Sequence, residues 1–336
     1  MAENYSQDTK GAQFAIDKSW PLMDQALSHL PARSSYEILN YGAADGGTSM
    51  DYFRRIFEEL KGKRIYFTSN DLPQNNFNGL APNLEILRSE FEGLCVFIQP
   101  TSFYNLIARE DSVDIGFAAT TMHWLSQVPR RAIGHLHPNR VEGDIREQFR
   151  AQALTDFDRL LKLRACEFRR GGHFILVDLA QTPDGEFLGH NGTDPDLFDT
   201  LHDIWKALLN EKLISKETFE YTLIENYYKT ADEVQRILDL PHSKKNWKVH
   251  SLSTKTISGP SRTQFAQDGD ISIYASKVMK AVRSWCRHSF MSAVQQTGGD
   301  PSTVELLFSR LQQRIAETPE QYNVSGVHNF IHLERL

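Results

Sequence analysis

The run VDIGFAATTMHWLSQVP, residues 113–129, contains a strand and the turn at which it leaves the core. Its first seven residues are mostly apolar or small, as is typical of a strand buried on both faces of a parallel sheet. We expect a strand over 113–124 that ends in His123 and Trp124, before Pro129. Periodicity alone places Trp124 in the core. At the carboxyl end of a strand, where α/β folds bind ligands, it is also a candidate site residue.

Strand and helix patterns alternate on both sides of this run. A glycine-rich turn joins the first strand to an amphipathic helix, and a glycine pair opens the strand after 113–124. Strands that alternate with helices predict a parallel sheet in an α/β layer fold. The predicted strands are 36–42, 64–71, 95–100, 113–124 and 171–181, and the predicted helices between them are 48–60, 83–94 and 145–169.

The alternation stops after residue 181, where a turn-rich link covers 182–196. The extra helices that follow predict a cap over the sheet. Expected helices are 197–214, 230–238, 271–290 and 302–316, with a strand at 246–254. The expected division is an α/β core with an N-terminal substrate segment at 1–182, a helical cap at 183–245 and 256–300, and remaining core strands and helix at 246–255 and 301–336.

Composition limits the class of protein. The chain of 336 residues has a net charge of −6 and no long run of one sign, which disfavours a nucleic-acid partner. No apolar run reaches the ~18 residues of a membrane span, and the polar N-terminus lacks a secretory signal. The three cysteines show no metal-ligand spacing, so we expect reduced thiols, a cytoplasmic protein and no metal site.

Polar and small residues follow three successive predicted strands. YGAADGGTS (41–49) is a tight turn that lets backbone approach a ligand, although it is neither a dinucleotide motif nor a P-loop. Asp71 offers two acceptor oxygens to a ribose diol, with a helix-capping role as the alternative. Ser102 and Phe103 would flank a flat ring, with a local turn and a core aromatic as the alternative. Together these residues outline a nucleoside-type pocket.

Four segments in this order carry a resemblance to a known family. SNDLPQNNFN (69–78), TSFYNLI (101–107), TTMHWLSQVP (120–129) and the helix followed by GGHFILV (171–177) resemble the SABATH methyltransferases. In that family the first three segments read NDLPGNDFN, GSFYxxLF and SLHWLSQVP. The resemblance extends over about 5–182 and continues more loosely through ENYYKTADEV (225–234) and YASKVMKAVRSW (274–285). It implies a carboxyl methyltransferase that uses S-adenosylmethionine (SAM) and releases S-adenosylhomocysteine. The implied fold is Rossmann-like, with a mostly parallel seven-stranded sheet and an α-helical cap.

The resemblance also implies which residues hold SAM. Gly42 and its neighbours would turn against the methionine half, and Asp71 would hold the ribose, with Leu72 against the adenine. Ser102 and Phe103 would lie at the adenine. Tyr5, in a segment that resembles the family's SYAxNSxxQ, would meet the SAM side.

On the substrate side, the resemblance implies that Trp124 donates its indole N–H to the substrate carboxylate, a role suited to a donor-only group. Gln13 would contact the same carboxylate, at a spacing from Tyr5 one residue longer than in the family. His123 would line the site. Phe198 and Trp205 are candidate pocket walls, and for each one a core position is the alternative.

Three positions depart from the family pattern. Asn40 stands where an acidic residue would contact SAM, and Asp45 is a candidate to compensate for the missing charge. Thr120 replaces a tyrosine, which leaves more room near the point of methyl transfer. The loop PRRAIGHLHPNRV (129–141) differs in sequence from the corresponding loop of the family, and it either contacts an acidic substrate or lies in solvent.

The leading interpretation is methyl-ester formation on a small aromatic or dicarboxylic acid of secondary metabolism by a non-plant, homodimeric enzyme. A carboxylic acid with a pKa near ~4 is already a nucleophile at neutral pH, so no residue is needed as a general acid or base. The alternatives are N-methylation of a small heterocycle and a SAM-binding protein without turnover.

Overall fold

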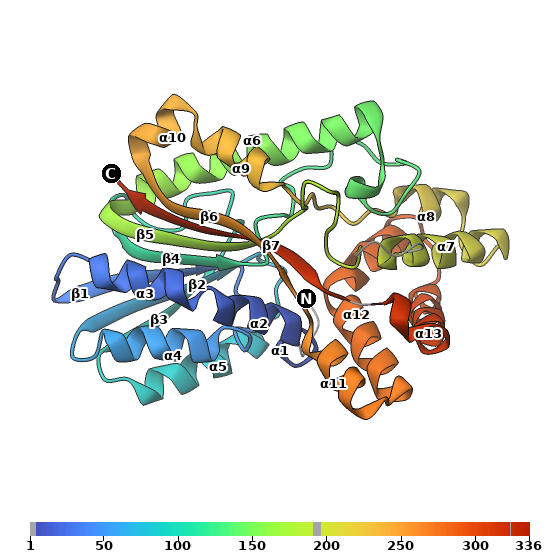
Figure 1. Cartoon of the computed structure of the whole chain (residues 1–336), viewed down its shortest axis with the longest axis horizontal. Coiled ribbons are helices and arrows are strands. Elements are labelled where there is room, and N and C mark those ends of the chain that lie inside the picture. The colour runs from blue at the N-terminus through green and yellow to red at the C-terminus, as the bar shows by residue number, and fades with distance from the viewer. Residues whose placement is uncertain (1–4, 191–195, 323) are drawn as a thin grey trace.

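One seven-stranded sheet forms the centre of the molecule (Figure 1). The structure is a computed structural model that describes residues 5–190, 196–322 and 324–336, so residues 191–195 of the turn-rich link lie outside the described part. The strand order is β3-β2-β1-β4-β5-β7-β6, and β7 runs antiparallel to both β5 and β6 while the other pairs are parallel. The strands are β1 Ser35–Tyr41, β2 Arg64–Asp71, β3 Leu94–Pro100, β4 Val113–Ala119, β5 Phe168–Leu179, β6 Trp247–Ile257 and β7 Gly326–Arg335. The predicted mostly parallel sheet of seven strands is confirmed.

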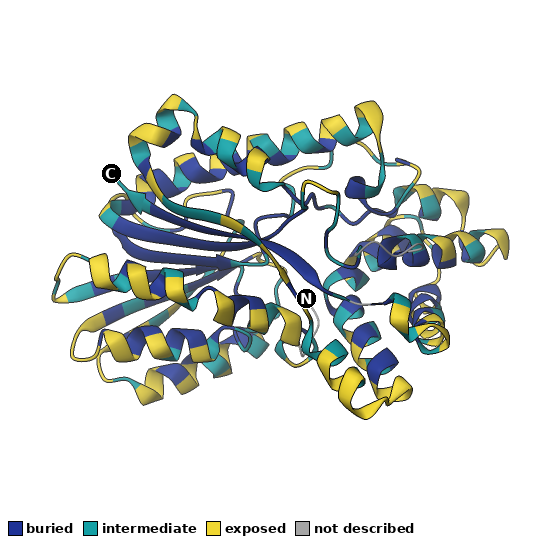
Figure 2. Ribbon diagram, viewed as in Figure 1, coloured by how far each residue is buried: buried dark blue, intermediate teal, exposed yellow. Residues whose placement is uncertain are grey.

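Helices cover both faces of the sheet, and its central strands β1, β4, β5 and β7 are mostly buried, whereas the edge strands β3 and β6 are largely exposed or partly exposed (Figure 2). On α4, Tyr52, Phe53, Ile56 and Phe57 recur at helical spacing and pack on the sheet, while polar side chains alternate with them. One face carries α3 (Trp20–His29), α4 (Met50–Glu59) and α5 (Phe77–Glu90), and the other carries α6 (Gly143–Glu167), α9 (Ala231–Leu238) and α10 (Pro241–Asn246).

The strand order sets the position of the crevice. β1 pairs with β2 on one side and with β4 on the other, so the connections after β1 and after β4 leave in opposite directions. In open α/β sheets this arrangement opens a crevice beyond the carboxyl ends of the two strands. The turns after β1 and β4 therefore face the place where a ligand would bind.

A helical cap lies beyond that end of the sheet (Figure 1). Its helices share one apolar cluster that includes Trp205, Val282 and Phe308. The cap helices are α7 Leu197–Asn210, α8 Lys216–Tyr221, α11 Pro260–Asp268, α12 Ile271–Gln296 and α13 Ser302–Glu317. Helix α13 packs against α12 and α7, although the sequence analysis grouped residues 301–336 with the core. The N-terminal helices α1 (Tyr5–Asp8) and α2 (Lys10–Lys18) contact α12 and α11, respectively.

The strand expected over 113–124 is shorter than predicted. It ends at Ala119, and Thr120 adopts φ +49°, a left-handed conformation that a β-branched residue rarely takes. The Thr120 N–H still donates to the Val177 carbonyl oxygen at 2.7 Å, so the turn stays fixed to β5. The regular strand ends at this point, and His123 and Trp124 therefore lie beyond the sheet, at a turn.

Among the described residues, no helix is both long and apolar enough to cross a membrane.

A buried ion pair fixes the turn after β3. Both Arg164 and Glu167, at the end of α6, have fully buried side chains and are joined at 2.8 Å. Arg164 also donates to the carbonyl oxygens of Phe103 and Asn105 at 2.8 and 2.7 Å. Glu167 accepts from the Tyr41 hydroxyl at 3.0 Å. The pair holds the Ser102–Phe103 turn against the core.

We expect Arg164→Leu to lower the free energy of unfolding by about 3–5 kcal/mol, because it leaves the Glu167 carboxylate buried without its partner. The measurement is denaturant unfolding. The control is Arg88→Leu on α5, which breaks an exposed pair with Glu85 and should leave the midpoint unchanged. A loss for Arg164→Leu no greater than for the control would contradict this role.

Candidate active site

A pocket lies between the carboxyl end of the sheet and the cap. Its described walls are mainly apolar and aromatic, and none of them is a lysine or an arginine. They are Tyr5, Thr9, Gly11, Ala12, Thr120, His123, Trp124, Leu179, Leu188, Asn226, Tyr228, Ile257, Gly259, Ala281, Trp285, Val324, Gly326 and His328. The N-terminal helices, the turn after β4 and the cap thus each contribute to one pocket.

Trp124 enters this pocket with its backbone held in place. Its carbonyl oxygen accepts from the Tyr104 hydroxyl at 2.6 Å, and its backbone forms an isolated bridge with Asn226. Its ring packs against His288, with centroids 5.1 Å apart. Within the described part of the chain, no hydrogen-bond acceptor is recorded for its indole N–H. Trp124 therefore brings a fixed ring and a free donor to the pocket.

His123 is held by a buried pair of charges. Its Nδ1 lies 3.1 Å from Asp178 Oδ1, and Lys229 Nζ lies 3.1 Å from Asp178 Oδ2. Lys229 also donates to the Met122 carbonyl oxygen at 3.0 Å. All three side chains are at most 5% exposed. A buried carboxylate is therefore matched by one buried ammonium and oriented toward the histidine.

The charges of this group follow from its surroundings. Burial lowers the pKa of His123, although the hydrogen bond and the charge of Asp178 oppose this shift. Burial alone would raise the pKa of Asp178, but Lys229 and His123 hold it below its usual range. An ionised Asp178 accepts the Nδ1–H of a neutral His123, so Nε2 keeps its lone pair. His123 thus lines the pocket as a neutral ring with an acceptor nitrogen.

Tyr5 connects this pocket to the glycine turn. Its side chain interacts with that of Thr120, and the carboxylates of Asp45 and Asp71 are close enough to affect its pKa. Burial, together with these carboxylates, raises the pKa of Tyr5 to about 12, so it remains a neutral phenol. The sequence-predicted residues Tyr5 and Thr120 are therefore brought together at the boundary between the pocket and the strand ends.

The turn after β1 and Asp71 form a second, adjoining cradle. Gly42 adopts φ +76°, and a Cβ atom there would lie 2.3 Å from the Thr121 side chain. Asp71 is buried, and its two oxygens accept from the N–H groups of Ala44 and Leu72 at 2.7 Å each. Burial raises the pKa of Asp71, and these two backbone donors oppose the rise. Each oxygen retains a lone pair, which is what recognition of a ribose diol requires.

The other predicted cofactor residues lie around the same strand ends. Asn40 is buried, and its amide donates to the Ser49 hydroxyl at 3.5 Å. Asp45 accepts from the backbone N–H groups of Ser6 and Gly47 at 2.9 and 3.1 Å, so it fixes α1 to the glycine turn. Leu72 is 47% exposed, which leaves its side chain available to a ligand.

The turn after β3 combines one accessible and one buried residue. Ser102 is partly exposed, and its hydroxyl accepts from the Tyr104 N–H at 3.3 Å. Phe103 is buried and packs on the ring of Tyr104. The local turn weighed in the sequence analysis is therefore present.

Three predicted substrate residues lie outside the pocket walls. Gln13 is half-buried on α2 and accepts from Lys10 at 3.3 Å, whereas Gly11 and Ala12 of the same helix line the pocket. Phe198 is fully buried against His137. Trp205 is also fully buried, and its indole N–H donates to Thr222 at 3.0 Å. Phe198 and Trp205 therefore occupy the core positions that were the alternative for each.

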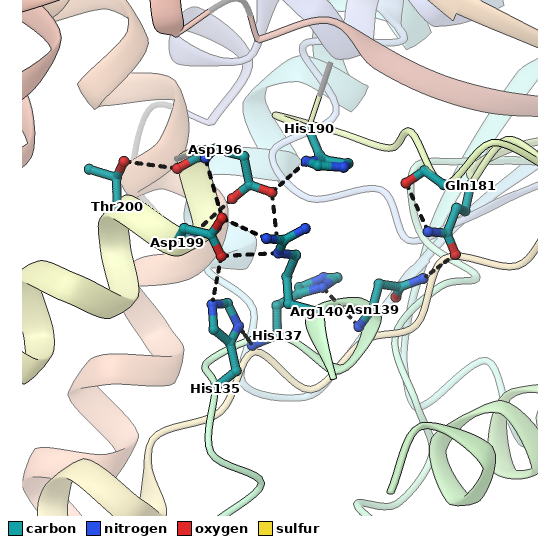
Figure 3. Close-up of polar contacts among 10 residues, drawn as sticks. His135, His137, Asn139, Arg140, Gln181, His190, Asp196, Asp199 and Thr200 are labelled. Carbon is teal, nitrogen blue, oxygen red and sulfur yellow. Dashed lines mark hydrogen bonds and ion pairs between the residues drawn. The ribbon is translucent and has the colours of Figure 1, made fainter. Parts of the chain in front are cut away.

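The rewritten loop 129–141 fastens the cap to the core (Figure 3). Arg140 pairs with Asp199 on α7 through contacts of 3.0 and 2.6 Å, and His135 lies 3.2 Å from the same carboxylate. Asn139 donates to Gln181 at 3.2 Å, and His137 is fully buried. The loop is therefore neither solvated throughout nor part of the pocket walls.

Several residues around His123 and the pocket were not predicted from the sequence. Asp178 interrupts the apolar strand FILVDLA, and an acidic residue in a buried strand indicates a buried partner. Lys229 lies in ENYYKTADEV, a segment noted only for its resemblance. His328 and Trp285 come from the end of the chain and from a cap helix. Their approach to the pocket depends on tertiary packing that periodicity does not encode.

Comparison with known proteins agrees with this geometry. The family profile described as SAM-dependent carboxyl methyltransferase matches residues 3–336. The solved structure of a loganic acid methyltransferase with S-adenosylhomocysteine superimposes with a TM-score of 0.77 at 18% identity, covering 100% of this chain and 97% of that one.

Two relatives illustrate the range of the family. Methyltransferase FUS9 of Gibberella fujikuroi is 24% identical over 87% of this chain and 82% of its own length. A probable 7-methylxanthine methyltransferase of Theobroma cacao is 22% identical over 67% of both chains. With a family match that spans almost every residue, the chain belongs to the SAM-dependent carboxyl methyltransferase family, and SAM is its cofactor.

Proposed function

We propose that this enzyme esterifies the carboxylate of a small aromatic acid that carries a single acidic group. The observation that carries the proposal is the unpartnered indole N–H of Trp124 in a pocket with no lysine or arginine among its described walls. One carboxylate can be held there by a neutral donor. A second carboxylate would be buried without a counter-charge, which favours a monocarboxylic over a dicarboxylic acid.

The residues in the adjoining cradle fit SAM. Asp71 offers free lone pairs for the ribose, and the tight turn at Gly42 provides close backbone approach. Tyr5, Asn40 and Asp45 would face the methionine half, with Leu72, Ser102 and Phe103 at the adenine. When bound, SAM supplies an electrophilic methyl group on a sulfonium.

The work of the protein is then to align the acid and to exclude water. Trp124 orients the carboxylate without neutralising it as a lysine or arginine would, so its nucleophilicity is kept. Positioning of this kind lowers the activation free energy by about 7–11 kcal/mol in well-oriented systems. We also propose that α7, α8 and α11 to α13 act together as the cap that closes the pocket.

The acceptor nitrogen of His123 bears on substrate choice. A lone pair would repel a carboxylate but would accept a hydrogen bond from a hydroxyl or N–H on the same molecule. We therefore propose that the preferred acid carries such a donor beside its carboxyl group. N-methylation of a heterocycle is the second candidate, because the same acceptor would suit a ring N–H.

Homodimer formation, a cytoplasmic location and a place in secondary metabolism stay predictions. They rest on the family resemblance and on the composition of the chain.

We expect Trp124→Phe to lower kcat/KM for the acid by about 10- to 100-fold, the equivalent of roughly 1.5–3 kcal/mol for a hydrogen bond to a charged group. The dissociation constant for SAM should stay within about twofold of its original value. Trp205→Phe is the matched control, since its N–H is used inside the cap. Equal losses in SAM binding and in turnover for Trp124→Phe would show that Trp124 does not contact the acid.

We expect His123→Phe to abolish the preference for a hydroxy-substituted aromatic acid over its unsubstituted parent. Asp178 and Lys229 remain paired with each other in this variant, and retained SAM affinity reports an intact fold. The measurement is the ratio of kcat/KM values for the two acids. If the variant keeps the original ratio, His123 does not accept a hydrogen bond from the substrate hydroxyl.

The rate of ester formation should be flat between about pH 6 and 9, because a carboxylic acid with a pKa near ~4 is ionised throughout. Burial lowers the pKa of His123 below its ordinary value, so any titration of this ring would affect the acid end of the profile only. The measurement is the pH profile of kcat/KM with the acid as substrate. A rise of about tenfold per pH unit would instead indicate that a proton must be removed from the acceptor.

A further inference from the structure

Three histidines gather at the opposite end of the sheet from the methyl-transfer pocket. His173 is the first residue of β5 that pairs with β7, His250 lies on β6 and His332 lies on β7. On β5, Asp178 at the active site is five residues beyond His173, which corresponds to about 16 Å along a strand. The cluster is therefore separate from the site described above.

The antiparallel placement of β7 brings these side chains together. Its pairings put His332 opposite Ile175 on β5 and opposite Ser251 on β6. A register shift between Val249 and Ser251 brings His250 into the cluster. The ring centroids of His173 and His332 are 5.1 Å apart, and those of His250 and His332 are 4.5 Å apart.

We propose that His173, His250 and His332 form a binding site for a late first-row divalent metal ion, with zinc as the best fit. Each ring offers one nitrogen, and the three nitrogens lie within 4.8 Å of one another. Three imidazoles suit zinc, copper or nickel rather than magnesium or calcium, which prefer oxygen ligands. The methyl transfer proposed above uses none of these residues.

The distances are close to those of a metal site. Zinc–nitrogen bonds of about 2.0–2.1 Å put two nitrogens of a tetrahedral site about 3.3 Å apart. His173 Nδ1 and His332 Nε2 already lie 3.0 Å apart. The third ring must turn out of its stack on His332, where the two ring planes make an angle of 18°. His250 is the partly exposed member of the three, and metal binding would require its ring to rotate.

The cluster retains unsatisfied polar atoms. His173 and His332 are fully buried, and among the described residues His173 Nε2 and His332 Nδ1 have no hydrogen-bond partner. These are not the nitrogens of the 3.0 Å contact between the two rings, so the proposed metal ion would be held by His173 Nδ1 and His332 Nε2 instead.

The protonation state also suits a metal. Burial lowers the pKa of His173 to about 4 and that of His332 to about 3, so both rings are neutral at pH 7, the form that binds metal. His250 Nε2 lies 2.7 Å from Glu334, an arrangement in which the carboxylate takes the N–H and Nδ1 keeps its lone pair. A carboxylate behind a ligand histidine is a common support in metal sites.

The test uses tag-free full-length protein, stripped with a chelator and titrated with Co²⁺ or Zn²⁺ alone. We expect one ion per chain by calorimetry, visible absorption bands typical of tetrahedral cobalt, and a higher Tm with Zn²⁺. In His250→Asn, which changes the partly exposed ring, the stoichiometric binding, the cobalt bands and the rise in Tm should all be lost. His332→Leu should give the same result.

The control is His242→Asn, a partly exposed histidine on α10 that pairs with Asp158 and should leave metal binding unchanged. Methyl transfer by His250→Asn should equal that of the original enzyme, which separates this inference from the proposed function. Absence of stoichiometric binding to the original protein, or binding that survives both cluster variants, would overturn the proposal.

Discussion

The buried carboxylate of Asp178 joins the two halves of this enzyme. It lies near the end of β5, accepts from His123 on the turn after β4, and pairs with Lys229 from the segment that returns from the cap. A charge buried this deeply is tolerated only when an opposite charge and hydrogen bonds accompany it. Because each partner comes from a different part of the chain, the carboxylate fixes how the cap segment meets the sheet. The pocket forms where they meet.

The same interaction sets the chemistry of the pocket. Asp178 takes the Nδ1–H of His123 and leaves an acceptor nitrogen, while Trp124, the next residue, supplies a donor. A donor beside an acceptor is suited to an acid with a neighbouring hydroxyl. With no lysine or arginine among the described walls, selectivity would come from the direction of these neutral groups and from the shape of the aromatic walls.

Much of the fold was predictable because strand and helix periodicities are local. The strands β1, β2, β3 and β5 and the main cap helices lie close to their predicted ranges, Asp71 ends a strand, and the glycine turn, Ser102 and Phe103 follow strands as expected. The strand expected to reach Trp124 was too long, because its end depends on the left-handed Thr120, which hydrophobic pattern does not reveal. Hydrophobic pattern alone allows a core position for both Trp205 and Trp124. Only packing shows that one N–H is used by Thr222 while the other is free.

Transfer of a methyl group from SAM to a carboxylate oxygen is tested by mass spectrometry of the products after incubation of the purified protein with SAM carrying a deuterated methyl group and a panel of small acids and heterocycles. We expect labelled methyl esters, formed best from aromatic monocarboxylic acids with an adjacent hydroxyl. Labelled N-methyl products without any ester, or tight SAM binding without transfer to any acid, would contradict it.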